Sequence, residues 1–148
     1  MGAVIPSGNF ARLLLMLLLF TFDMPVTGGT ATVTEGAATV GVVTFNGDEI
    51  IVPLTNVADQ QYLTVNLSDV SSSIGGGGGT ASIRLGLLAG DVSQNRVVTL
   101  SDLGQVNAQV AQLVTAANYL KDVNASGTLS VADKGITNTQ ITKALPPP

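Results

Sequence analysis

The chain contains no histidine, no cysteine and no tryptophan among its 148 residues. These residue types carry out much of the proton transfer, thiol chemistry, zinc ligation and sugar stacking in proteins. Their absence predicts a protein that is not an enzyme, and it excludes disulfides as a source of stability. Carbohydrate binding is also disfavoured, because four Phe and two Tyr offer little aromatic surface to a sugar ring.

Positive charge is scarce as well, since six Lys and Arg face ten Asp and Glu and the net charge is −4. Nucleic-acid binding depends on clustered Lys and Arg side chains that contact phosphates. The composition therefore excludes nucleic acid as a partner and favours a protein that binds cations.

The apolar run LLLMLLLF at residues 13–20 is much shorter than the roughly 20 residues of a membrane-spanning helix. We therefore expect no transmembrane span. Two interpretations of residues 1–29 remain open. The run follows Arg12 and has the length of the apolar region of a secretory signal. Alternatively, it is a buried first strand that ends before the turn-favouring Pro25.

Residues 30–87 are rich in β-branched residues punctuated by Gly and Asn, a pattern typical of short strands. Asn46-Gly47 predicts a type I′ hairpin turn, and Pro53 is expected at a strand end or a sheet edge because it has no N–H to donate. The expected strands cover residues 30–34, 42–45, 48–54, 62–67 and 81–87.

Two further features of this region have structural interpretations. The five glycines at residues 75–79 lack the Lys and Ser or Thr of a phosphate-binding loop, so they predict a flexible connection between strands. The adjacent carboxylates Asp48 and Glu49 point to opposite faces beside a turn and do not form a general acid and base pair.

The spacing of these strands predicts a small antiparallel β-sandwich of immunoglobulin-like character. The stretches FDMPVT at residues 22–27 and VPLTNV at residues 52–57 resemble stretches in the β-sandwich repeats of large bacterial surface and secreted proteins. This resemblance implies a secreted or cell-surface protein.

An internal repeat with a period of 31 residues, the spacing between Asp91 and Asp122, occupies the last third of the chain. Such a period is typical of one supersecondary unit that has been duplicated. Identical residues at matching positions include Asp91 and Asp122, Asp102 and Asp133, Gly104 and Gly135, Asn107 and Asn138, and Gln109 and Gln140.

Each copy begins with a twelve-residue loop, residues 91–102 or 122–133, that carries oxygen-bearing side chains at loop positions 1, 3, 5, 9 and 12. Position 8 is apolar in both copies, as Val98 and Leu129. Ca²⁺ takes about six to eight oxygen ligands, and in such loops position 7 supplies a backbone carbonyl, here that of Val97 or Thr128. The loops therefore predict two calcium sites.

This pattern resembles the duplicated repeat of type I dockerins, in which a calcium loop is followed directly by a helix. The resemblance covers about residues 87–145. It implies the following ligands: Asp91, Ser93, Asn95, Val97, Thr99 and Asp102 in the first loop, and Asp122, Asn124, Ser126, Thr128, Ser130 and Asp133 in the second.

Apolar residues at helical spacing predict one helix after each loop. Leu103, Val106, Val110 and Leu113 mark the first helix, and Ile136, Ile141 and Leu145 mark the second, which is expected to stop at Pro146.

Calcium binding is expected to be weak, because each loop supplies two carboxylates and the one at position 12 is a short Asp. Extracellular modules with few charged ligands bind calcium with dissociation constants of about 10⁻⁴ to 10⁻³ M. The first loop has Arg96 at position 6, where the second has Gly127 and a sharp turn favours glycine. The alternative is that both loops are metal-free turns whose Asp, Asn and Ser side chains cap helices.

These observations predict an α+β fold class, with an antiparallel β-sandwich-like domain at residues 30–87 and a small helical dockerin-like domain at residues 88–148. The dockerin resemblance implies a non-catalytic module that binds a cohesin-like β-sandwich partner and anchors a polypeptide in an extracellular assembly, often one that degrades polysaccharide. The alternative is a calcium-stabilised C-terminal cap of a bacterial surface or adhesin-like β protein, with no partner in trans.

In dockerins, partner recognition relies on loop positions 10 and 11, which are commonly a pair of hydroxyl residues. Here these positions hold Leu100-Ser101 and Val131-Ala132, so Ser101 alone matches that pattern. The resemblance therefore predicts the docking role without identifying the partner.

Overall fold

The computed structural model describes residues 16–147, which divide into two compact units. The strand unit consists of residues 16–57 and 62–85, and the C-terminal unit consists of residues 58–61 and 86–147. Arg12 and residues 13–15 of the apolar run lie outside the described residues.

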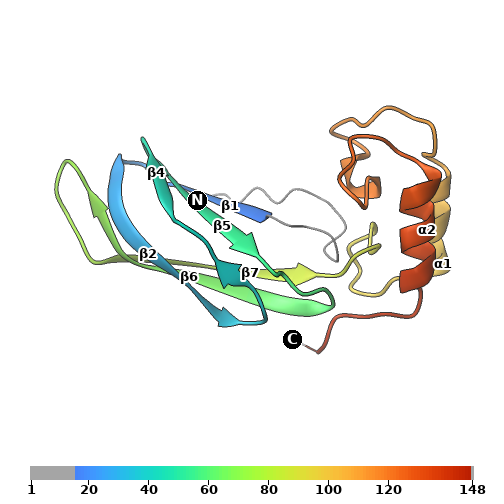
Figure 1. The fold of residues 1–148 in the computed structure, drawn as a ribbon, viewed down its shortest axis with the longest axis horizontal. Coiled ribbons are helices and arrows are strands. Elements are labelled where there is room, and N and C mark those ends of the chain that lie inside the picture. The colour runs from blue at the N-terminus through green and yellow to red at the C-terminus, as the bar shows by residue number, and fades with distance from the viewer. Residues whose placement is uncertain (1–15, 148) are drawn as a thin grey trace. The chain divides into compact units, whose positions relative to one another are not determined.

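The central strand of a four-stranded antiparallel sheet is β5 (Glu49–Thr55), which Figure 1 labels. β1 (Met16–Thr21) pairs with one side of β5. The other side pairs with β3 (Thr39–Val40) near its C-terminal end and with β4 (Thr44–Asn46) near its N-terminal end. The partner strand on that side is therefore interrupted at residues 41–43.

This interruption explains Pro53, which lies inside the central strand and not at a strand end or a sheet edge as predicted. The Pro53 carbonyl accepts a hydrogen bond of 2.7 Å from the N–H of Gly41. This side of Pro53 therefore faces the gap between β3 and β4, where the N–H that proline lacks has no regular ladder partner. Gly41 allows the close approach, because a Cβ there would lie 3.3 Å from the Pro53 Cβ.

The hairpin between β4 and β5 turns one residue later than predicted. Asn46 pairs with Glu49, so the two loop residues are Gly47 and Asp48. Gly47 has a φ of 62°, and glycine at the first loop position is typical of a type II′ turn. A slip of one residue would turn the buried side chains of β5 toward solvent, so their burial fixes this register.

A three-stranded sheet in the same unit has β6 (Gln61–Ser72) between β2 (Val26–Glu35) and β7 (Gly79–Leu87). β2 runs antiparallel to β6 with three irregularities in register. The glycine-rich segment joins β6 to β7, and its residues Gly75, Gly76 and Gly78 adopt positive φ angles with open space around them.

The core of the strand unit lies between these sheets (Figure 1). Its two largest fully buried side chains, Phe20 and Met16, both come from β1, which also buries Leu18. Other fully buried residues come from the alternating positions of β5 and β6, namely Ile50, Val52, Leu54, Leu63, Val65 and Leu67. The described part of the apolar run is therefore a core strand.

The C-terminal unit consists largely of turns and loops. Within residues 86–147 its helices are α1 (Leu100–Asn107), α2 (Val131–Gln140) and a short 3₁₀ helix at Tyr119–Lys121. The prediction of a helical dockerin-like domain is therefore wrong, although the α+β class broadly fits the described residues. Strands in two sheets dominate the described chain, and two short helices do not make a helical domain of two loop-helix repeats.

Both helices also end earlier than their apolar spacing predicted. The C-caps are Ala108 for α1 and Ile141 for α2, and beyond them the chain turns at Ala111 and Thr142, whose φ angles are 69° and 78°. No helix within residues 16–147 is long and apolar enough to cross a membrane. The predicted helix residues that lie beyond the helix ends are Val110, Leu113, Ile141 and Leu145.

Candidate metal-binding loops

Loop 1 (residues 91–102) and loop 2 (residues 122–133) repeat the same backbone conformation. Gln94 and Ala125 have φ angles of 60° and 51°, and Arg96 and Gly127 have φ angles of 73° and 81°. The members of each pair are 31 residues apart in the sequence. The repeat found in the sequence is therefore also a repeat of backbone structure.

The carboxylate at position 1 of each loop accepts hydrogen bonds from the backbone N–H groups at positions 5 and 6. Asp91 accepts hydrogen bonds from the N–H of Asn95 at 3.1 Å and of Arg96 at 2.7 Å. Asp122 accepts the equivalent bonds from Ser126 at 2.9 Å and Gly127 at 2.8 Å. These bonds stabilise the turn at positions 4 to 6, where the positive φ angles occur.

The carboxylate at position 12 is fully buried in both loops, with 0% exposure for Asp102 and Asp133. Asp102 accepts hydrogen bonds from the N–H of Ser93 at 2.9 Å, and from the N–H and hydroxyl of Thr99 at 2.8 and 2.9 Å. Asp133 accepts the matching bonds from Asn124 at 3.2 Å and from Ser130 at 2.8 and 2.9 Å.

These bonds make a capping box at the start of each helix, because Thr99 and Ser130 are the N-caps and the position 12 aspartates are the N3 residues. Burial raises the pKa of Asp102, but hydrogen bonds from Ser93 and Thr99 outweigh that effect, and the pKa lies below its usual range. The carboxylate therefore stays ionised at neutral pH inside the fold.

The remaining predicted ligand residues make hydrogen bonds within their own loops. Ser93 donates its hydroxyl to Asp91 at 3.2 Å, and the Asn95 side chain accepts the N–H of Val97 at 3.0 Å. In loop 2 the Ser126 and Thr128 hydroxyls lie 2.9 Å apart. The fold thus gathers the predicted residues of each loop into one turn of chain, while their role as metal ligands stays a prediction.

The donor chemistry of the loops fits a hard cation. Every side-chain donor among the predicted ligands is a carboxylate, amide or hydroxyl oxygen, and position 7 adds a backbone carbonyl. Oxygen donors of this kind suit Ca²⁺ and not zinc, which prefers nitrogen and sulfur. Each loop contributes two carboxylates, and within residues 16–147 no group of three or more His, Cys, Asp or Glu residues could hold a metal ion.

Comparison of the chain with protein-family models, with curated proteins and with solved structures finds no match. The resemblance to dockerins therefore rests on the spacing of the loop residues.

A small apolar core supports the loops from within the C-terminal unit. Val92 and Val123, which occupy position 2 of the two loops, are buried together with Val106 of α1, and Ile136 of α2 packs against them. Matching residues of the two repeats thus share one core. The duplicated loops are packed against each other through this core and are not two separate surface turns.

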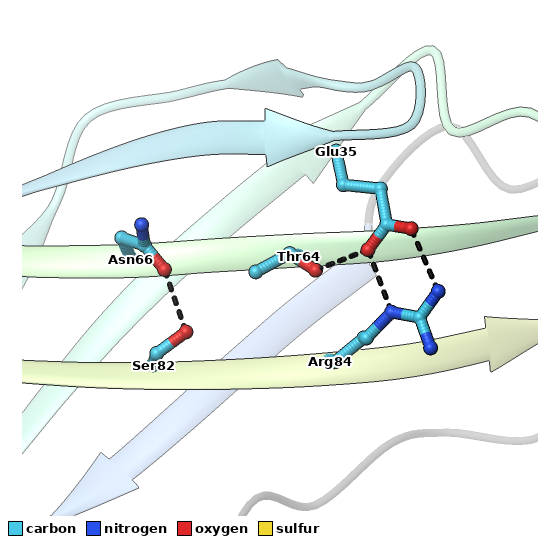
Figure 2. A network of polar contacts seen from close by, with 5 residues as sticks. All are labelled: Glu35, Thr64, Asn66, Ser82 and Arg84. Atoms are coloured by element: carbon cyan, nitrogen blue, oxygen red, sulfur yellow. Dashed lines mark hydrogen bonds and ion pairs between the residues drawn. The ribbon is translucent and has the colours of Figure 1, made fainter. Parts of the chain in front are cut away.

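Sequence reasoning missed a polar network on the outer face of the three-stranded sheet, which Figure 2 shows. Arg84 donates two hydrogen bonds to Glu35, at 2.7 and 2.8 Å, and Thr64 donates to the same carboxylate at 2.6 Å. The guanidinium also lies 3.9 Å from the centre of the Tyr62 ring.

This network connects β2, β6 and β7 across residues that are far apart in the sequence, so no local pattern could have revealed it. The hydrogen bonds from Arg84 and Thr64 lower the pKa of Glu35 to about 2. The Arg84 guanidinium lies over the Tyr62 ring, a cation–π arrangement. We interpret the network as a structural tie between strands.

Proposed function

We propose that the C-terminal unit is a non-catalytic calcium-binding module that docks a partner protein and anchors its parent polypeptide outside the cell. The observation that supports this proposal best is the repetition of loops 1 and 2. Backbone conformation, hydrogen bonds and oxygen donors all recur at an interval of 31 residues. A helix cap alone needs a Ser or Thr and one acidic residue, here at positions 9 and 12, and it does not require matched oxygens at the three further positions 1, 3 and 5.

The ion would stabilise each loop by neutralising its two carboxylates and by linking both ends of the loop. The residues that would hold it are those at positions 1, 3, 5, 7, 9 and 12, with Val97 and Thr128 contributing their carbonyls. With two carboxylates in each loop, the expected dissociation constant is about 10⁻⁴ to 10⁻³ M. Such sites fill at extracellular calcium concentrations, which agrees with a secreted or cell-surface location.

A pair of exposed apolar side chains supports the docking role. Leu100 and Val131 occupy position 10 of the two loops, at the first residue of α1 and of α2, and they are 71% and 74% exposed. An aliphatic side chain that is so exposed at both copies of a repeat suits burial against another protein. We propose a cohesin-like β-sandwich as that partner, in an extracellular assembly of the kind that degrades polysaccharide.

Calcium titration of the full chain by calorimetry tests the metal-binding part of this proposal. We expect saturable binding that is lost at loop 2 in the Asp122→Ala, Asp133→Ala double variant. A matched control is the Asp48→Asn, Glu49→Gln variant, which removes the same charge at the β4–β5 hairpin, outside the loops, and should bind like the original chain. Absence of binding up to about 10 mM calcium would contradict the proposal, because this concentration exceeds the expected dissociation constants.

A panel of immobilised cohesin-like domains tests the docking part. We expect calcium-dependent retention of the full chain by at least one panel member, and loss of retention in a Leu100→Asp, Val131→Asp double variant. The Val42→Asp variant is a control, because Val42 is 81% exposed but lies in the strand unit, outside the loops.

A second candidate function is a calcium-stabilised cap that binds no partner. It is favoured by the hydrogen bonds of Asp102 and Asp133, since each carboxylate already joins the start of its loop to the start of its helix. Calcium binding without retention by any panel member would support this candidate over docking.

A further inference from the structure

Each loop is bonded to the segment that follows the helix of the other repeat. Residues 142–145 follow α2, yet they lie along loop 1. The N–H of Thr142 donates to the carbonyl of Val98 at 2.9 Å, the N–H of Val98 donates to the carbonyl of Lys143 at 2.8 Å, and the N–H of Leu145 donates to the carbonyl of Arg96 at 2.9 Å.

The same arrangement occurs with the two repeats exchanged. Residues 111–113 follow α1 and lie along loop 2. The N–H of Ala111 donates to the carbonyl of Leu129 at 2.8 Å, and Leu113 forms a β-bridge with Thr128. The matching bridge joins Ala144 to Val97.

These bonds fix the peptide group that connects positions 8 and 9 of each loop. In a trans peptide the C=O and the N–H point in opposite directions. The carbonyl of Val98 accepts the bond from Thr142, while the N–H of Thr99 in the same peptide group donates to the buried carboxylate of Asp102 at 2.8 Å. Residues 142–145 therefore bind the carbonyl of this peptide group, and the position 12 carboxylate binds its N–H.

Loop 2 repeats this clamp. The carbonyl of Leu129 accepts the bond from Ala111, and the N–H of Ser130 donates to Asp133 at 2.8 Å. In loop 1, the bond from Val98 to Lys143 also turns the carbonyl of Val97 away from the following segment, because both belong to one peptide group. That carbonyl is the predicted ligand at position 7.

We infer that Thr142 is a positioning residue for loop 1 and Ala111 for loop 2, so that each loop holds its shape through the other repeat. The expected effect on calcium affinity rests on the proposed function, whereas the expected effect on the conformational stability of the loops does not. Loss of Thr142 should thus disturb a loop about 40 residues away in sequence and leave the nearer loop 2 intact.

Proline is the sharpest test at both positions. It has no N–H to donate and its φ is fixed near −65°, whereas Thr142 and Ala111 have φ angles of 78° and 69°. Thr142→Pro and Ala111→Pro are therefore matched variants that should act on opposite loops. Thr142→Gly keeps both the N–H and the positive φ, so it is a control that should leave both loops unchanged.

Amide hydrogen exchange of the full chain without calcium gives the first readout. We expect Thr142→Pro to speed exchange of the Ser93, Arg96 and Thr99 amides on the order of tenfold. The Asn124, Gly127 and Ser130 amides should keep their rates, and Ala111→Pro should give the opposite result. Equal effects on both loops, or an effect on the nearer loop, would overturn the inference. If Thr142→Pro fails to fold, Leu145→Pro removes one bond to loop 1 and should show the same selectivity.

Calcium titration gives the second readout. In the Asp122→Ala, Asp133→Ala background, where loop 1 is the remaining site, Thr142→Pro should weaken binding about tenfold and Ala111→Pro should leave it unchanged. Equal weakening by the two prolines would overturn the inference. If the original chain binds no calcium but the exchange pattern is crossed as expected, the proposed function fails and this inference stands.

Discussion

At the residue scale, the two loops differ most at position 6, where the same backbone conformation holds different side chains. Arg96 has a φ of 73° and Gly127 a φ of 81°. A non-glycine residue in the left-handed region costs about 1–2 kcal/mol. The backbone of loop 1 is therefore strained at position 6, whereas that of loop 2 is not, although both loops have the same conformation there.

Arg96→Gly should relieve this strain. We expect it to raise the free energy of unfolding of the C-terminal unit by about 1 kcal/mol, measured by denaturant unfolding with amide exchange of the loop. Gly127→Ala is the reverse change, and it should destabilise the unit by a similar amount through backbone conformation alone, since a Cβ at Gly127 meets nothing within 4 Å. No difference between the two variants would argue against strain at this position.

The ion pair of Glu35 and Arg84 predicts an unusual titration. The pKa of Glu35 is lowered from 4.5 to about 2, mainly by the hydrogen bonds from Arg84 and then by that from Thr64. Because the folded-state pKa is lowered, the pair contributes stability above pH 4.5 and loses it as the pH falls toward 2.

Titration of the Glu35 carboxyl by NMR should give a pKa of about 2 in the original chain and a higher pKa in Arg84→Gln, still below 4.5 because the hydrogen bond from Thr64 remains. Ser82→Ala is the matched control, because Ser82 donates to Asn66 at 2.6 Å on the same sheet face and does not contact Glu35. A pKa that stays low in Arg84→Gln would assign the shift to Thr64.

At the element scale, β1 supplies the largest buried side chains of the strand unit, so its two faces should respond differently to truncation. Leu18 is 0% exposed and faces the core, whereas its neighbour Leu17 is 43% exposed and faces outward. Leu18→Ala should lower the free energy of unfolding of the strand unit by about 2–5 kcal/mol. Leu17→Ala, the same chemical change on the other face, should cost well under half as much. Similar losses in denaturant unfolding would mean that β1 is not held in this register.

The presence of strands and turns could be predicted from the sequence, whereas the register in which the strands pair could not. Asn46-Gly47 correctly indicates a hairpin, yet the burial of Ile50, Val52 and Leu54 decides which residue begins the turn. Pro53 was misplaced for a similar reason. Its missing N–H is tolerated in a central strand because the neighbouring strand breaks at Gly41, and that break is a tertiary feature with no local signature.

The ends of the helices could not be predicted from the sequence either. Apolar residues at helical spacing continue past both helix ends, as in Val110 and Ile141, but the chain turns away at Ala111 and Thr142. At these two residues the N–H groups donate hydrogen bonds to the opposite loops. Spacing alone gave the loop residues and their order, whereas the crossed bonds between repeats could be seen only in three dimensions.

At the scale of the whole molecule, the two compact units should respond separately to calcium. Only the C-terminal unit carries the predicted ligands, and an ion that binds the folded state stabilises it by RT ln(1 + [L]/Kd). With a dissociation constant of about 10⁻³ M, about 10 mM calcium would add roughly 1.4 kcal/mol for each site. The strand unit has no share in this stabilisation.

Amide exchange of the full chain with and without 10 mM calcium measures both units at once. We expect slower exchange in the C-terminal unit, including α1 and α2, and unchanged exchange in β5 and β6. Equal magnesium is the control for ionic strength, because Mg²⁺ requires octahedral geometry and gives up its water reluctantly. Slower exchange in both units with either ion would indicate a general salt effect. Selective protection by calcium would instead tie the stability of the C-terminal unit to the two loops.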